Sequence, residues 1–108
     1  MKNTKSFLRG YDMKNCRTTD FIEHTKYEEC ALQYKNIKYF FNGIIFDKSA
    51  GKYTYRIDIW DQHNNYVKTV YDQSFNTEKE CIDNALIAKI FDKNSFWDVE
   101  NELEWIEW

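Results

Sequence analysis

The sequence predicts an α+β fold in a single domain over residues 1–108. We expect a mainly antiparallel sheet of three to five strands, packed against a single layer of one or two helices. Two patterns lead to this prediction. Apolar and polar side chains alternate over residues 53–72, and apolar side chains recur at helical spacing over residues 81–91. With 43% hydrophobic and 19% aromatic residues, the chain can build a core from large rings without disulfides or metal.

The first predicted helix begins near Asp20, in the segment DFIEHTKYEECALQY (20–34). Its apolar side chains recur at close to helical spacing. They are Phe21, Tyr27, Cys30, Ala31 and Tyr34. Thr19 or Asp20 can cap the N-terminus of this helix. The preceding residues have no regular pattern, although apolar side chains near residues 7–11 could form a short additional turn.

Strand structure is expected after this helix. The segment NIKYFFNGIIFD (36–47) alternates in polarity, and Gly43 in its middle predicts a bulge or a turn between two short strands. KSAG (48–51) has the composition of a turn.

The alternation is clearest in YTYRIDIWD (53–61), which predicts a strand with two different faces. One face carries Tyr53, Tyr55, Ile57 and Ile59, and the other carries Thr54, Arg56, Asp58 and Trp60. The asparagines of QHNN (62–65) tolerate positive φ, and YVKTVYD (66–72) resumes the alternation. We therefore expect a β-hairpin whose first face is core and whose second face is mostly in contact with water.

The second predicted helix is CIDNALIAKIF (81–91), whose wide apolar face should lie across the sheet. Thr77 is suited to cap it, and Glu80 is placed to complete a capping box.

The final segment, SFWDVENELEWIEW (95–108), fits three geometries. It can be a helix capped by Ser95 with Asp98 closing the capping box, a strand from Asn101, or a helix followed by a strand. The segment also holds most of the negative charge. Residues 92–108 carry six acidic side chains against one lysine, a net charge of −5 in a chain whose total is −3.

The composition disfavours several classes of protein. Proline is absent and glycine occurs three times, so no glycine-rich phosphate loop is present. The three cysteines, Cys16, Cys30 and Cys81, are widely spaced and suggest buried thiols in a reducing compartment. We expect a cytoplasmic protein without a secretion signal or a membrane span, because no segment approaches the roughly 20 apolar residues that a span needs.

The residues that could ligate a metal or act as a nucleophile do not form a recognisable site, so we expect no cofactor and no catalytic centre. His24, His63 and the cysteines lack the spacing of a metal site, so no metal is expected. Cys81 lies in the first turn of a predicted helix, where a thiol pKa is lowered, and His63 could act as its base. The apolar face that Cys81 shares favours a buried structural thiol instead.

Two nucleic-acid functions remain as alternatives on the 53–72 hairpin. A metal-dependent nuclease could place Asp58, Asp61 and Asp72 around Mg²⁺, with Arg56 and Lys68 nearby, but ordinary cross-strand charge pairs account for the same residues. A nucleic-acid-binding sheet could stack bases on tyrosines. These are Tyr53, Tyr55, Tyr66 and Tyr71. The acidic charge disfavours it, so we expect neither an enzyme nor direct contact with nucleic acid.

The acidic aromatic terminus is the main candidate for function. In a helix with an inward apolar stripe, Trp97, Trp105 and Trp108 cannot all be buried, and exposed tryptophan ringed by carboxylates suits a basic protein partner. In a closing strand, the same rings would be core. The predicted partner-binding residues are Trp97, Asp98, Glu100, Glu102, Glu104, Trp105, Glu107 and Trp108, with His63, Asn64 and Asn65 at the hairpin tip.

The combination of YTYRIDIWDQHNNYVKTVYD, NTEKECIDNALIAKIFD and the acidic aromatic terminus resembles small acidic bacterial inhibitors. The immunity proteins (antitoxins) that neutralise contact-dependent growth-inhibition toxins are the best-populated example. The resemblance implies a non-enzymatic cytosolic protein that binds a basic toxin nuclease and occludes its active site or substrate surface. A phage-encoded inhibitor of a host nuclease has the same surface properties. The sequence is compatible with a monomer or a small homo-oligomer.

Overall fold

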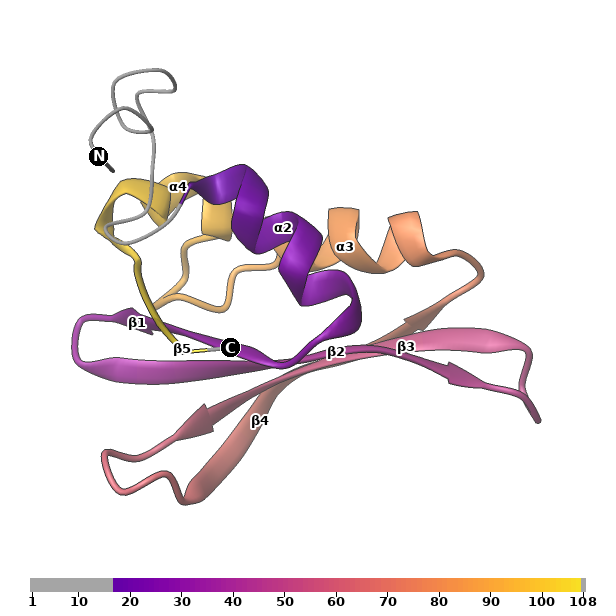
Figure 1. Cartoon of the computed structure of the whole chain (residues 1–108), viewed down its shortest axis with the longest axis horizontal. Helices are drawn as coiled ribbons and strands as arrows, with labels where there is room; N and C mark the ends of the chain where they lie inside the picture. Colours follow the sequence, from indigo (N-terminus) through magenta and orange to yellow (C-terminus); the bar gives the residue numbers. More distant parts are fainter. Residues whose placement is uncertain (1–16, 108) are drawn as a thin grey trace.

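A computed structural model describes residues 17–107 of the chain, without the side chain of Glu107 (Figure 1). Its elements are α2 (Thr18–Tyr27), β1 (Cys30–Tyr34), β2 (Ile37–Asp47), β3 (Lys52–Trp60), β4 (Tyr66–Phe75), α3 (Glu78–Ile87), α4 (Phe96–Val99), a 3₁₀ turn (Glu100–Glu102) and β5 (Glu104–Glu107). All neighbouring strands are antiparallel, in the order β4-β3-β2-β1-β5. This confirms the predicted α+β class. The short turn suggested near residues 7–11 lies outside the described residues.

The three helices of the described part lie on one face of the sheet, and none lies on the other (Figure 1). The core fills the space between the helices and this covered face. Phe21 of α2 is at its centre, with its ring 5.1 Å from Phe41 of β2, 5.4 Å from Phe96 of α4 and 5.6 Å from Trp105 of β5. Rings therefore join helices and strands, as the aromatic composition suggested.

The first helix is shorter than its sequence pattern predicted. It ends at Tyr27, and Cys30–Tyr34 form β1 instead of continuing the helix. Cys30, Leu32 and Tyr34 point into the core, which is the period of two that a strand requires. β1 pairs with β2 on one side and β5 on the other, and these long-range hydrogen bonds override the local helical spacing.

The predicted irregularity at Gly43 is a β-bulge within one long strand. The register between β2 and β3 shifts between Phe41 and Ile44, and Gly43 has a φ of +80°. A Cβ at this position would lie 3.5 Å from the backbone nitrogen of Glu28, although the conformation itself already favours glycine. The bulge lets β2 continue to Asp47, and the predicted turn at 48–51 joins it to β3.

The capping boxes predicted for α3 and α4 are both present, whereas α2 begins after Arg17 without a side-chain cap, so the cap predicted at Thr19 or Asp20 is wrong. The Thr77 hydroxyl accepts a hydrogen bond from the Glu80 backbone N–H, and the Glu80 carboxylate accepts one from the backbone N–H of Thr77. The helix α3 ends at Ile87, earlier than the predicted residue 91, because Ala88 takes an extended conformation. The chain then turns back so that Phe91 enters the core. Within the described range, no helix has the length and apolarity to span a membrane.

Candidate partner-binding surface

The terminal segment adopts the third predicted geometry, a short helix followed by a strand. Helix α4 begins after Ser95, whose hydroxyl accepts a hydrogen bond from the Asp98 backbone N–H at 3.3 Å, and β5 pairs with β1. This arrangement separates the tryptophans. Trp97 is 44% exposed on α4, and Trp105 is 6% exposed in β5.

Trp105 belongs to the core and is not available to a partner, which corrects its assignment to the binding surface. It lies opposite Leu32 in the β1–β5 register, and its ring centroid is 5.5 Å from that of His24. β5 is a strand, so side chains alternate between faces, and Trp105 takes the covered face while Glu104 takes the other. Trp108 lies outside the described residues.

Two of the predicted carboxylates make hydrogen bonds within the fold. Asp98 Oδ2 accepts from the Ser95 backbone nitrogen at 2.9 Å and from the Ser95 hydroxyl at 3.1 Å, and these bonds lower the pKa of Asp98. Glu100 Oε2 accepts from the Thr18 hydroxyl at 3.0 Å, which ties the 3₁₀ turn to the start of α2. Both side chains are thereby oriented by partners within the fold.

The remaining acids of the segment are less constrained. Glu102 is exposed and Glu104 is half-buried, and neither makes a side-chain ion pair in the described part of the chain. Glu107 lies at the end of β5, with its side chain outside the description. Glu104 points to the open face of the sheet, away from α4, which separates it from Trp97. We call Trp97, Asp98, Glu100 and Glu102 the acidic Trp97 surface.

The hairpin tip does not join this surface. Asp61 accepts hydrogen bonds from the backbone nitrogens of His63 at 2.8 Å and Asn65 at 2.9 Å, and Asn64 has a φ of +64°, as expected for a tight turn. The exposed tip stands at the β3–β4 end of the sheet, while β5 forms the opposite edge beyond β2 and β1. The structure therefore separates the two parts of the predicted site.

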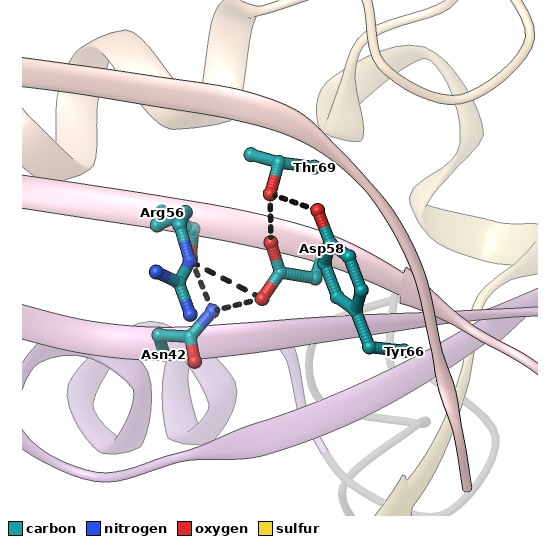
Figure 2. A network of polar contacts seen from close by, with 5 residues as sticks. All are labelled: Asn42, Arg56, Asp58, Tyr66 and Thr69. Carbon is teal, nitrogen blue, oxygen red and sulfur yellow. Dashed lines mark hydrogen bonds and ion pairs between the residues drawn. The ribbon is translucent and has the colours of Figure 1, made fainter.

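The uncovered face of the sheet carries a polar network that the sequence analysis missed (Figure 2). Asp58 is only 1% exposed, although no described helix covers it. Its Oδ2 accepts from Asn42 Nδ2 at 3.1 Å and from Arg56 Nε at 3.2 Å, and its Oδ1 accepts from the Thr69 hydroxyl at 2.7 Å. Since the Thr69 proton points at Asp58, the Tyr66 hydroxyl, 3.0 Å away, donates to Thr69.

This network leaves few free acceptor positions on Asp58 and holds Arg56 and Tyr66 in fixed positions near the surface. Beside it, the rings of Phe40 and Trp60 lie with their centroids 4.9 Å apart. The alternation over residues 53–61 did place Arg56, Asp58 and Trp60 on one face. It could not reveal that Asp58 is buried, because the partners that bury it come from β2 and β4.

The structure does not gather the hairpin acids into a metal site. Asp61 is occupied by its turn, Asp72 is exposed opposite Arg56, and Lys68 faces the other side of the sheet, opposite Ile59. Over residues 17–107, no group of three or more His, Cys, Asp or Glu side chains is placed to hold a metal ion.

The sequence-predicted thiol and stacking sites also take core positions. Burial, followed by Glu80 and Glu78, raises the pKa of Cys81, the reverse of what a reactive thiolate needs. Among the four sheet tyrosines, Tyr55 is core and Tyr53 and Tyr71 are half-buried against the helices. Tyr66 is the exposed one, so the set provides no row of stacking rings.

Comparisons of the chain with protein-family models, curated proteins and solved structures gave no match.

Proposed function

We propose that the chain is a non-catalytic inhibitor that binds and neutralises a basic partner protein in the cytoplasm, as the immunity protein of a bacterial toxin nuclease. One observation carries the proposal. Trp97 is 44% exposed on a helix fixed by a complete capping box, and carboxylates flank it on the same segment. The resemblance to small acidic inhibitors supports the same conclusion.

The local geometry suits tight binding because the anchor is held in place before the partner arrives. Phe96 is buried beneath α4, and its ring meets the Trp97 ring edge to face at 5.2 Å. Tryptophan is enriched among residues that dominate binding energy, and a preformed position reduces the entropy lost on binding. Trp97 would enter a pocket of the partner and slow dissociation.

The carboxylates supply the second part of the mechanism. Asp98 and Glu100 are oriented by Ser95 and Thr18, and Glu102 is exposed on the next turn. Arginines and lysines that hold nucleic-acid phosphates in a nuclease would pair with these acids instead. Such charges mainly raise the association rate, and the effect weakens as salt rises.

A direct test first captures the binding partner of the chain from the native host. The proposal requires that this partner is a basic nuclease. The purified chain should then stop its cleavage of nucleic acid at about one-to-one stoichiometry. Trp97→Ala should raise Kd about 30-fold, the loss of about 2 kcal/mol expected for a hot-spot tryptophan. Ile87→Ala, which truncates an even more exposed apolar residue on α3, is the matched control and should leave Kd unchanged.

The charge contribution is tested on the same complex. Glu102→Gln should lower the association rate and flatten its salt dependence, while Glu29→Gln, at an exposed position before β1, should change neither. Wild-type binding by both Trp97→Ala and Glu102→Gln would refute the proposed surface. Mg²⁺-dependent nucleic-acid cleavage by the chain itself, lost in Asp58→Asn, would refute the inhibitor and restore the nuclease alternative.

A further inference from the structure

A groove of 340 Å³ lies at one end of the sheet, and Glu102 of the acidic Trp97 surface is close enough to interact with Lys35, which lines the groove. It is bounded by the β1–β2 turn, the middle of β4 and the loop after α3. Branched apolar side chains, Ile59, Val70 and Ile90, form its floor, and Lys35, Lys68 and Lys93 stand around it. This volume lies at the lower end of the range of small-molecule sites, about 300–1,000 Å³.

The groove is basic on a chain whose net charge is −3. Lys35 Nζ lies 3.8 Å from Asp92, and Asp92 is the acidic residue that lines the groove. Lys68 and Lys93 have no ion-pair partner within the described residues. The residues that line the groove therefore carry an excess of about two positive charges, and nearby Glu102 offsets part of it. The hydrogen bond to the Tyr34 side chain is the main cause that raises the pKa of Lys35, and Asp92 and Glu102 also raise it.

Two of the lysines occupy backbone positions that disfavour them. Lys35 and Asn36 have φ angles of +49° and +66°, and Asp92 and Lys93 have φ angles of +53° and +70°. Each pair forms the centre of a two-residue turn, where glycine or asparagine adopts positive φ at the lowest cost. Lysine is a costly choice at both positions, and both lysines border the same groove.

We propose that this groove binds a small amphipathic anion, an alkyl or aryl phosphate or carboxylate, with its charged group between Lys68 and Lys93 and its apolar body on the isoleucine and valine floor. Neither contact is sufficient alone. Exposed lysines bind simple anions weakly, and the floor provides little area without a charged anchor. The proposed site does not depend on the proposed inhibitor function and uses different residues, although Glu102 of the acidic Trp97 surface lies near Lys35.

The test titrates the full-length protein with 1-naphthyl phosphate and with octyl phosphate, followed by amide chemical shifts in ¹⁵N NMR. At least one probe should saturate with Kd at or below about 1 mM, and the shifted amides should cluster at residues 34–39, 68–70 and 90–93. Naphthol has only the apolar ring and inorganic phosphate has only the charged group, so each should bind at least about tenfold more weakly. Tighter binding of 1-naphthyl phosphate would indicate an aryl ligand, and tighter binding of octyl phosphate would indicate an alkyl ligand.

Two double variants separate the groove from general charge. Lys68→Gln with Lys93→Gln should weaken binding at least about tenfold, while Lys48→Gln with Lys52→Gln, at the far end of β2 and β3, removes the same charge and should change Kd less than about twofold. Lys93→Gly should weaken binding while keeping or raising Tm, because glycine relieves the positive φ.

Three results would overturn the proposal. They are the absence of saturable shifts for both probes, equal loss in the two double variants, and inorganic phosphate binding as tightly as the organic phosphates. If Lys68→Gln with Lys93→Gln failed to fold, the shift map of the wild-type protein would still decide whether the ligand sits in the groove.

Discussion

The two faces of the sheet bury residues by different means. The covered face excludes water with helices and packs rings such as Phe21, which has an exposed fraction of 0%. The open face has no described helix, yet it buries Asp58 to 1% exposure beneath its own neighbours. There the polar network of Asn42, Arg56 and Thr69 takes the place of apolar packing. The side chains on one face of a strand can thus be selected by how their shapes pack, and those on the other face by the geometry of their hydrogen bonds.

The largest expected effect lies on the covered face. Phe21→Ala removes a ring that contacts Phe41, Phe96 and Trp105, and the cavity left between α2 and the sheet cannot collapse easily. We expect a loss of about 3–5 kcal/mol in the free energy of unfolding, measured by urea denaturation. Ile45→Ala, an exposed strand residue, should change it by less than about 0.5 kcal/mol. A small effect of Phe21→Ala would show that α2 does not hold the core together.

A smaller effect is expected on the open face. Asp58→Ala leaves Asn42, Arg56 and Thr69 without their shared acceptor and should cost about 1–3 kcal/mol by the same measurement. Because the Arg56 side chain is half exposed, water can satisfy part of the lost bonding. Asp72→Ala, an exposed acid on the same strand pair, is the control and should be nearly neutral. Equal effects of the two variants would mean that the network adds nothing specific.

The smallest effect concerns the capping box at the start of α4, on the covered face. Hydrogen bonds from Ser95 lower the pKa of Asp98 in the folded protein below its unfolded value of about 3.9. The stabilisation is therefore complete above the unfolded pKa and is lost as pH falls through the lower folded value. Asp98→Asn should reduce Tm slightly at neutral pH, and the difference from wild type should shrink as the pH falls from about 7 to below about 4. A constant difference across that range would exclude the charge as the cause.

Local patterns in the sequence predicted the parts of the fold that depend on neighbouring residues. The alternation over 53–72 gave the hairpin and its two faces, and Thr77 with Glu80 gave the start of α3. The segment 30–34 was misassigned because its apolar residues satisfy both a helical period and a period of two. Pairing with β2 and β5 decides between them, and that pairing connects residues far apart in the chain.

The candidate surface was predictable to a similar extent. Its acids and Trp97 stand out by composition, and the capping signature of Ser95 and Asp98 correctly located the helix that carries Trp97 and Asp98. The different placement of Trp105 follows from its register against Leu32, which no local pattern encodes. The network around Asp58 and the basic groove likewise combine residues from three or more elements.

The position of β1 between β2 and β5 has a consequence for how the protein folds. β1 to β4 are joined by short turns and form a meander of local contacts, whereas β5 pairs with β1 only after α3 and α4 have been passed. Contacts between distant residues form late because the intervening chain must first be ordered. During synthesis, the backbone donors and acceptors along the outer side of β1 stay unpaired until residues 104–107 emerge. A nascent chain therefore exposes an unpaired edge of β1 that can form hydrogen bonds with a strand of another copy. Pairing with β5 covers this edge.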